Sequence, residues 1–244
     1  MNIAIIFAGG VGTRMHSKDK PKQFLMMHGK PIIIHTLDVF QNHQQIDAIC
    51  IACVKEWIPY LEEILTEFRI TKAVRVVPGG GTAQDSTYNG LIAAKDVAQG
   101  EKSIVLIHDG VRPMINDRLI TENIEAVKQY GSAITSVPAK ETVVVMNGGS
   151  MDVSDVLDRS QLRIARAPQC FWLDEILEAH EKTREMKLSG FIDSCSLMKF
   201  YGKNIHLVDG PIENIKITTP DDFYVLRAIL DAKENAQIYG FEGI

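Results

Sequence analysis

A glycine-rich segment near the N-terminus, FAGGVGTRMHSKDKPKQFL from Phe7 to Leu25, combines a flexible backbone with positive charge. Glycines let backbone N–H groups approach an anion closely because no Cβ stands in the way. Arg14, Lys20 and Lys22 add cations on the same loop. A cradle of backbone donors with two or three cations suits a polyphosphate. The alternative, for the glycines alone, is an ordinary strand–loop turn with surface lysines.

The spacing of these residues separates the loop from two familiar phosphate-binding loops. The dinucleotide fingerprint G-x-G-x-x-G fails because Met15 occupies the place of its third glycine, and the P-loop G-x-x-x-x-G-K-[ST] has no match here. The order small-Gly-Gly-x-Gly-x-Arg, followed by Pro-Lys, is instead typical of nucleotidyltransferases. It is formed by Ala8, Gly9, Gly10, Gly12, Arg14, Pro21 and Lys22.

A carboxylate follows a second apolar segment. Residues 103–107 (SIVLI) run directly into the sequence HDGVRP, which contains His108, Asp109 and Arg112. Asp109 is well placed there to hold a divalent metal against phosphate oxygens, and Arg112 to bind a phosphate. The alternatives are that Asp109 caps the following turn and that Arg112 forms a surface salt bridge. His108 is interpreted as a packed histidine and receives no role.

Further basic residues occur late in the chain. Lys216 stands between two isoleucines in a predicted strand, so its side chain faces away from theirs. Arg159, Arg163 and Arg166 follow one another at short intervals and could bind a second anion. The alternatives are a solvated lysine and an exposed basic edge.

Strand-like and helix-like segments alternate along the chain. The strands are predicted at 2–7, 48–54, 73–77, 103–107, 132–137 and 204–208, and the helices at 31–41, 57–68, 85–97, 117–129, 172–185, 193–201 and 220–234. Fully apolar strands in such alternation predict an α/β fold with a Rossmann-like, mostly parallel sheet covered by helices on both faces. Ligands bind such sheets at the carboxyl ends of the strands. This places the segments 9–22, 79–86, 108–113 and 214–218 together.

Residues 140–166 break this alternation. Two strand-like runs, 141–146 and 153–157, flank Asn147-Gly148-Gly149, and Asn-Gly between such runs is a strong hairpin signal. An isolated hairpin buries little of itself, so it is expected to lean on a second subunit. The alternative is a flap within one chain.

Composition limits the classes of function. The 244 residues are 45% hydrophobic and 23% charged with a net charge of −5, so a general nucleic-acid surface is not expected and any anion site must be a local basic pocket. No stretch of about 18 apolar residues suggests a membrane span, and the N-terminus lacks the pattern of a signal peptide.

Four cysteines are present, and two of them, Cys50 and Cys53, form a C-x-x-C inside a predicted strand. Residues three apart on a strand point to opposite faces, which argues against a metal or redox pair. Both cysteines are therefore predicted to pack as small hydrophobic residues. A cytoplasmic location follows as the default.

The sequence lacks a Ser/His/Asp order, a zinc ligand set and a Schiff-base signature. The residues fit instead a direct in-line attack by a substrate phosphate on a nucleotide α-phosphate. In that chemistry the protein positions two anions and neutralises the charge that builds on phosphorus. Two mutually repelling anions need several cations, which Arg14, Lys22, Arg112, Arg159 and Lys216 would supply.

Together these motifs resemble the cytidylyltransferases that act on small polyol phosphates, and the resemblance spans Ala8 to about Asp222. It implies a fold of the nucleotide-diphospho-sugar-transferase type with a protruding β-hairpin arm, and one nucleotidyltransferase domain over residues 1–244. It also implies transfer of CMP from CTP to a polyol phosphate, Mg²⁺ as cofactor, and a homodimer that exchanges the arm at about residues 140–166.

The resemblance also implies roles for single residues. Arg14 and Lys22 would stabilise the transition state, and Asp109 would serve the metal and the ribose. Lys216 would act in catalysis and, with Arg112, meet the polyol phosphate, while Thr142 and Arg159 from the partner's arm would complete that pocket. The nucleotide would be bound by Ala8, Gly9, Gly10, Gly12, Gly80, Gly81, Ser86 and Asp109.

Two branches of this family are close. One acts on ribitol 5-phosphate in teichoic-acid and capsule synthesis, and the other on 2-C-methyl-D-erythritol 4-phosphate in isoprenoid synthesis. The run FAGGVGTRM, Val111 and Asp193-Ser194-Cys195 resemble the ribitol branch, so D-ribitol 5-phosphate is the predicted substrate. The chain departs from the family at Ala83, where an arginine is common, and at Ala167, where a threonine is usual.

Three alternatives stay open. The same chemistry on methylerythritol phosphate is the nearest. A nucleotide-binding protein that no longer catalyses belongs to another class, and the intact Arg14, Lys22, Asp109 and Lys216 argue against it. A hexose-1-phosphate nucleotidyltransferase shares the first loop but predicts other nucleotides and a longer chain.

Overall fold

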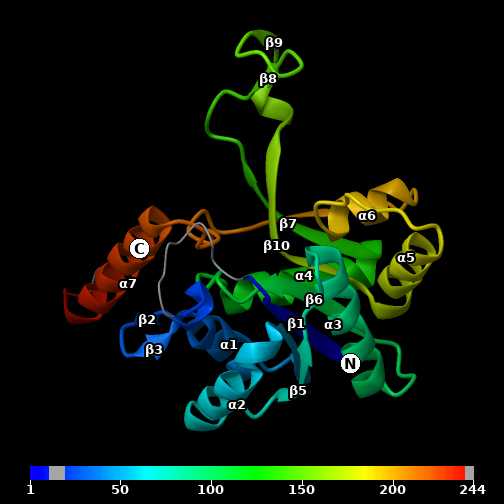
Figure 1. Cartoon of the computed structure of the whole chain (residues 1–244). Coiled ribbons are helices and arrows are strands. Elements are labelled where there is room, and N and C mark those ends of the chain that lie inside the picture. Colours follow the sequence, from blue (N-terminus) through cyan, green and yellow to red (C-terminus); the bar gives the residue numbers. More distant parts are fainter. Residues whose placement is uncertain (11–19, 240–244) are drawn as a thin grey trace.

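The computed structural model describes residues 1–10 and 20–239 (Figure 1). The strands are β1 (Asn2–Ala8), β2 (Met26–Met27), β3 (Lys30–Pro31), β4 (Ala48–Cys53), β5 (Ala73–Pro78), β6 (Ile104–Asp109), β7 (Ser132–Pro138), β8 (Val144–Met146), β9 (Val153–Val156), β10 (Arg163–Trp172) and β11 (Leu207–Asp209). The helices are α1 (Ile32–Asn42), α2 (Ile58–Glu67), α3 (Ala83–Ala98), α4 (Asp117–Tyr130), α5 (Leu173–Glu185), α6 (Ser194–Phe200) and α7 (Pro220–Tyr239).

Seven strands of the described chain form one sheet in the order β11-β7-β10-β6-β1-β4-β5. β1 pairs in parallel with both β4 and β6, β4 with β5, and β7 with β11, which confirms the mostly parallel sheet. After β1 the chain adds β4 and β5 on one side and then crosses to β6 on the other. The carboxyl ends of β1 and β6 therefore open a crevice at the switch point, beside Ala8 and Asp109.

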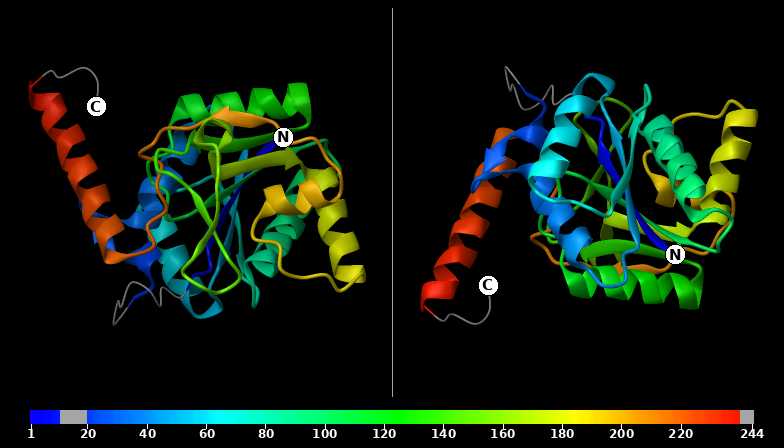
Figure 2. Two further views of the ribbon diagram at one scale, coloured as in Figure 1. Left: turned by 90° about the horizontal axis from the view of Figure 1, so that it is seen from above. Right: turned by 90° about the horizontal axis from the view of Figure 1, so that it is seen from below.

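Helices cover both faces of the sheet, as the alternation predicted (Figure 2). The helices α1, α2 and α4 pack on one face over Ala4 and Ile6 of β1. The helices α3, α5 and α6 pack on the other face over Ile3 and Ile5. Because successive side chains of a strand point to opposite faces, β1 contributes to both cores and is held in place from both sides.

The sequence prediction missed strand β10, which lies antiparallel between β6 and β7. Its basic residues interrupt the apolar pattern that is expected of a strand. Pro168 also argues against a central strand, because proline cannot donate a hydrogen bond to its neighbour. The register between β10 and β7 shifts between Ala165 and Gln169, and Pro168 falls inside that interruption. Arg163 and Arg166, which the sequence suggested for a second anion or an exposed basic edge, lie in the first half of β10; residues 163–165 there are exposed and pair with β7 alone.

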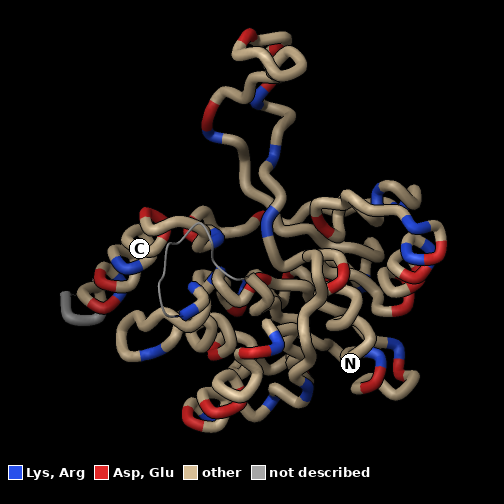
Figure 3. Tube along the Cα trace, viewed as in Figure 1, with Lys and Arg blue, Asp and Glu red and all other residues tan. Residues whose placement is uncertain are grey.

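The predicted hairpin is confirmed, since β8 and β9 pair antiparallel. The arm that carries it, at residues 140–162, projects from the body and its strands are exposed throughout (Figure 1). Acidic and basic residues are interspersed along the arm and over the body (Figure 3). No helix within 1–10 and 20–239 is long and apolar enough to cross a bilayer.

The interpretation of Cys50 and Cys53 as packing residues is also confirmed. Both are fully buried on β4, with Cys53 in the core beneath α1 and α2 and Cys50 in the core beneath α3. Burial raises the pKa of each thiol to about 12. Neither side chain is therefore suited to nucleophilic or redox chemistry.

The last helix positions a loop that the sequence analysis predicted as a strand. Residues 210–218 form an irregular loop. Within it, the fully buried Ile217 packs with Leu226 of α7, and its N–H donates to the carbonyl of Val111 at 3.0 Å. Asp222, in the first turn of α7, accepts hydrogen bonds from the N–H groups of Thr218 and Thr219 at 2.8 Å each. These contacts fix Lys216 on the loop instead of on a strand.

Candidate functional site

A cavity of about 310 Å³ lies at the carboxyl ends of β1 and β6. Predicted site residues from four segments of the chain meet in its wall. They are Ala8, Gly9, Gly10, Lys22, Gly80, Gly81, Ser86, Asp109 and Lys216. Gly12 and Arg14, which complete the first glycine loop in the sequence prediction, lie outside the described residues.

Lys22 belongs to a short 3₁₀ turn, Lys22–Phe24, that is packed against the body. Phe24 is fully buried and stacks on Trp57 with ring centroids 5.3 Å apart. The side-chain Nε2 of Gln23 donates to the carbonyl of Ala8 at 2.7 Å, which ties the turn to the end of β1. Lys22 is only 8% exposed, so its charge faces a partly desolvated cavity where it acts strongly on an anion.

The second glycine loop leads into α3. Ser86 Oγ accepts from the Gly80 N–H and donates to the Thr82 carbonyl, each at 3.0 Å. Thr82 caps the helix by accepting from the Asp85 N–H at 3.0 Å. A Cβ at Gly80 would lie 2.1 Å from the Asp85 Cβ, so only glycine fits there. The loop thus places the N-terminus of α3 in the cavity wall, where its dipole favours an anion.

Asp109 joins three segments through its carboxylate. Its Oδ1 lies 2.7 Å from Lys216 Nζ, and its Oδ2 accepts from Arg112 Nε at 2.8 Å. Burial alone would raise the pKa of this carboxyl group, but the charges and hydrogen bonds of Lys216 and Arg112 hold it well below its usual range. Asp109 is therefore ionised at neutral pH, and it is more than the helix or turn cap that the alternative interpretation offered.

A second cavity of about 260 Å³ adjoins the first. The two share Phe7, Ala83, Asp109 and Lys216 in their walls. The rest of the second wall combines apolar side chains with charged and polar ones; the charged and polar ones are Thr87, His108, Arg112, Arg166, Gln169, Asp193 and Ser194. Two adjoining cavities with cations at their boundary can hold two anionic ligands side by side.

His108 is buried, as interpreted from the sequence. Its Nε2 contacts the Arg112 carbonyl at 3.1 Å, which closes the turn between Asp109 and Arg112. Burial lowers the pKa of His108 to about 4, so the ring is neutral at pH 7 and braces the turn without carrying charge.

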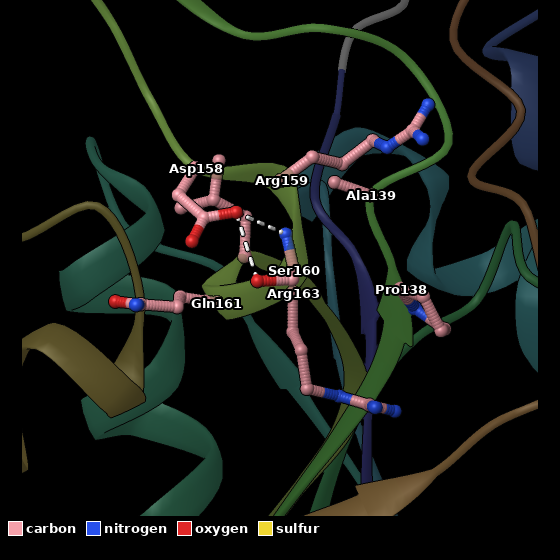
Figure 4. Close-up of a pocket in the computed structure, with 8 residues that line it drawn as sticks. Pro138, Ala139, Asp158, Arg159, Ser160, Gln161 and Arg163 are labelled. Carbon is pink, nitrogen blue, oxygen red and sulfur yellow. Dashed lines mark hydrogen bonds between the residues drawn. The ribbon is translucent and has the colours of Figure 1, made fainter.

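The arm residues lie apart from both cavities in the described chain. Thr142 is exposed. Arg159 lines a separate cavity at the base of the arm and donates from Nη1 to the Lys140 carbonyl at 3.0 Å. Arg159 and Arg163 extend in different directions, while Asp158 binds Ser160 beside them (Figure 4). One chain therefore does not bring Thr142 and Arg159 to the site.

Several residues that shape the site carry no signal in the sequence. Gln23 and Asn214 act through contacts with backbone far away along the chain: Asn214 is fully buried and donates from Nδ2 to the Ala167 carbonyl at 2.8 Å. Gln169 bonds Asp193 at 2.7 Å across the second cavity. A lone amide or carboxylate in the sequence gives no indication of such a partner.

The acidic groups near the site limit how a metal can be held. Within residues 1–10 and 20–239, no group of three histidine, cysteine or acidic side chains is arranged to bind a metal. Asp109 is an ionised single carboxylate between the two cavities. That arrangement fits Mg²⁺, which is commonly held by one or two carboxylates together with substrate phosphates and water.

Comparisons with known proteins agree with this fold. A model of the family described as "IspD: 2-C-methyl-D-erythritol 4-phosphate cytidylyltransferase" matches residues 2–232. The ribitol-5-phosphate cytidylyltransferase of Streptococcus agalactiae serotype V is 52% identical over 98% of this chain and 99% of that protein. The 2-C-methyl-D-erythritol 4-phosphate cytidylyltransferase of Clostridium novyi is 39% identical over 94% of this chain and 96% of that protein. The crystal structure of 4-diphosphocytidyl-2C-methyl-D-erythritol synthase from Anaerococcus prevotii matches with a TM-score of 0.79 at 28% identity and covers 94% of this chain and 98% of its own.

The charge balance around Asp109 generates a prediction about stability. Replacing Asp109→Asn leaves Arg112 and Lys216 without their anion, and we expect the free energy of unfolding at pH 7 to fall by about 1–3 kcal/mol. The native pKa of Asp109 lies below the unfolded value of about 4, so its contribution is present above that pH and is lost as the pH falls toward the native pKa. Urea unfolding of both proteins between pH 7 and pH 3 should therefore show a difference that narrows in acid. The variant Asp96→Asn, at an exposed position of α3, is the control and should unfold like the unchanged protein. A difference that stays constant with pH would contradict the assigned ion pairs.

Proposed function

The chain belongs to the 2-C-methyl-D-erythritol 4-phosphate cytidylyltransferase family, and on that premise we propose that it transfers CMP from CTP to D-ribitol 5-phosphate, giving CDP-ribitol and pyrophosphate. The observation that carries the choice of polyol is the 52% identity, over nearly the full length of both chains, to a ribitol-5-phosphate cytidylyltransferase. The second candidate substrate is 2-C-methyl-D-erythritol 4-phosphate, which is favoured by the name of the family and by relatives at 39% identity.

In the proposed reaction CTP occupies the first cavity. The backbone of Gly9 and Gly10 and the N-terminus of α3 face the triphosphate, while Gly80, Gly81 and Ser86 contact the cytosine and ribose. Lys22, and Arg14 from the preceding loop, neutralise the charge that develops on the α-phosphate. The low exposure of Lys22 supports this role, because a charge in a desolvated wall needs little reorganisation during the reaction.

The polyol phosphate occupies the second cavity, beside Arg112 and Lys216. One of its phosphate oxygens attacks the α-phosphate of CTP in line, a P–O bond forms, and the bond to pyrophosphate breaks. Lys216 stands at the boundary of the two cavities, so it can stabilise both anions as they approach. We assign Mg²⁺ to Asp109; when bound, it would neutralise phosphate oxygens of CTP. Asp109 would then exchange part of its present contact with Lys216 and Arg112 for the metal.

The arm completes the site from a second subunit. Its strands bury little within one chain, and several apolar side chains on it are exposed, including Val144, Met146 and Val156. A two-stranded hairpin of this kind is marginal alone, which supports its packing on another copy of the chain. In such a homodimer Thr142 and Arg159 reach the partner's second cavity and contact the polyol phosphate.

The choice of substrate is tested by pyrophosphate release with CTP and Mg²⁺. We expect release with D-ribitol 5-phosphate, and a much lower kcat/KM with 2-C-methyl-D-erythritol 4-phosphate. Release with the methylerythritol substrate alone would move the protein to the second candidate function. No release with either substrate, together with retained CTP binding, would favour a protein that binds nucleotide without catalysis.

Lys22 is expected to act mainly in the transition state. Replacing Lys22→Ala should lower kcat by roughly 10²–10³-fold while CTP still binds, because the charge matters most when the α-phosphate is under attack. Steady-state kinetics and a CTP titration measure the two effects separately. The control Lys55→Ala removes an exposed lysine and should leave kcat within about twofold. Unchanged turnover in the Lys22 variant would remove this residue from the mechanism.

Arg159 is expected to affect the polyol phosphate more than the nucleotide. Replacing Arg159→Ala should raise KM for the polyol phosphate by about tenfold or more, with a smaller change in KM for CTP, because a charged hydrogen bond to phosphate is lost. Lys140→Ala, on the same arm and also exposed, is the control for a lost positive charge. An equal rise in both KM values would contradict the assignment.

Mixing two variants tests whether the arm serves the partner's site. In a dimer of one Lys22→Ala chain and one Arg159→Ala chain, arm exchange gives one site with both defects and one intact site. Random mixing should then restore about a quarter of the sites. Activity that stays at the level of the two separate variants would show that each arm serves its own chain.

A further inference from the structure

The loop at residues 210–218 gathers arginines from two other elements. The carbonyl of Asn214 accepts from Arg112 Nη1 at 3.0 Å. The carbonyl of Ile212 accepts from Arg166 Nη1 at 2.6 Å, and that of Pro211 from the same atom at 3.4 Å. Lys216 is carried by the loop itself. Backbone carbonyls of one short segment therefore hold two guanidinium groups beside a lysine, at the wall of the second cavity.

The carboxylates in the same wall are already engaged. Asp109 binds Lys216 and Arg112 with its two oxygens. Asp193 accepts from the Ser196 N–H at 2.8 Å, where it caps α6, and from Gln169 Nε2 at 2.7 Å. Among the described residues, no carboxylate lies within ion-pair distance of Arg166. Three cations thus face two occupied anions across one cavity. Glu213, which does not line the cavity, acts on Arg166 from beyond ion-pair distance.

The proximity of the two arginines is itself unfavourable without an anion. Burial and then the positive charge of Arg112 lower the pKa of Arg166, and the negative charge of Glu213 offsets only part of this effect. Neutral carbonyl groups orient both guanidinium groups but do not cancel their mutual repulsion. An anion that bridges them would relieve this repulsion, and a tetrahedral phosphate has the acceptor oxygens to do so.

We propose that Arg166 is a phosphate-binding residue of the second cavity, where it holds the phosphate of the polyol together with Arg112 and Lys216. The proposal rests on the proposed function, since it assigns the phosphate to the polyol. Arg166 is then the third cation, after Arg112 and Lys216, that one chain supplies to the phosphate of the polyol. Arg159 would be added by the arm of the second subunit. The phosphate of this substrate is then bound from one subunit before any arm contributes.

The distribution of polar groups in the cavity also orients the substrate. The cations Lys216 and Arg112 lie toward the first cavity, through their shared contact with Asp109. The polar groups of Gln169, Asp193 and Ser194 belong to the same wall but carry no positive charge. The phosphate end of the polyol is therefore directed to the boundary with CTP. Its hydroxyl groups are directed to Gln169 and Asp193, because the carboxylate of Asp193 repels the phosphate.

The variant Arg166→Met tests this role because it keeps the unbranched stem and removes the charge. We expect KM for the polyol phosphate to rise by about 10–100-fold, KM for CTP to change by less than about twofold, and kcat to change little. Arg166→Lys should recover a large part of the loss, because it restores the charge without the planar fork. Inorganic phosphate should compete with the polyol phosphate more weakly in Arg166→Met than in the unchanged protein.

The control Arg118→Ala removes an exposed arginine of α4 that pairs with Glu122, and it should leave both KM values unchanged. Thermal unfolding and CTP binding show whether each variant retains its fold. An unchanged KM for the polyol phosphate in Arg166→Met, or an equal rise in both KM values, would overturn the proposal. Full activity in Arg166→Met with a loss in Arg166→Lys would do the same.

The outcome does not depend on which polyol is the substrate. If the unchanged protein uses methylerythritol phosphate instead of ribitol 5-phosphate, the proposed function fails while Arg166→Met should still raise KM for the phosphate-bearing substrate. If neither substrate is turned over, inorganic phosphate is the probe. The site is supported if inorganic phosphate protects the unchanged protein from thermal unfolding but does not protect Arg166→Met. Equal protection of both proteins overturns it.

Discussion

The arrangement of the site depends on the ion pairs that the carboxylate of Asp109 forms with Arg112 and Lys216. Asp109 ends β6, pairs with Arg112 in the following turn, and pairs with Lys216 on a loop more than a hundred residues later. Without this anion, the two cations would repel each other at the junction of the cavities. If Asp109 also holds the metal as proposed, substrate binding would rearrange the same contacts that assemble the site in its absence.

The rest of the fold supplies rigid supports for this junction. β1 is packed from both faces, Gln23 ties the Lys22–Phe24 turn to the end of β1, and Gly80 allows its loop to approach Asp85 closely. The antiparallel β10 brings Arg166 and Gln169 to the opposite wall. Lys22, Asp109 and Lys216 therefore stand on elements that packing holds in place, which is the condition under which the proposed site would stabilise a transition state without reorganisation.

The sequence predicted the parts of this structure that local patterns encode. Apolar strands that run into glycines located the crevice, and the spacing of Cys50 and Cys53 placed them on opposite faces of β4. Strand β10 was not predictable in the same way, because Pro168 and three basic or polar neighbours mask its periodicity. The contacts of Gln23 and Asn214 depend on backbone groups distant along the chain, and no pattern of residue types encodes such partners. Arg166 was among the basic residues that the sequence suggested for a second anion, but its place beside Arg112 in the second cavity was not predictable. Lys216 was placed on a strand because its isoleucine neighbours alternate, whereas α7 holds that segment as a loop.

The exposed arm connects the charges of the site with the proposed formation of a homodimer. Its apolar side chains are accessible in one chain, and Thr142 and Arg159 lie far from the cavities whose chemistry they would serve. A single chain already places Lys216, Arg112 and Arg166 around the second cavity. A partner's arm would then add the last cation only after the fold has formed the pocket, so assembly would close the site over two bound anions and would not be needed to create it. Placing several cations close together in an empty site costs electrostatic free energy, because they repel one another. If Arg159 comes from the partner's arm, each chain has one cation fewer to hold in its own empty site.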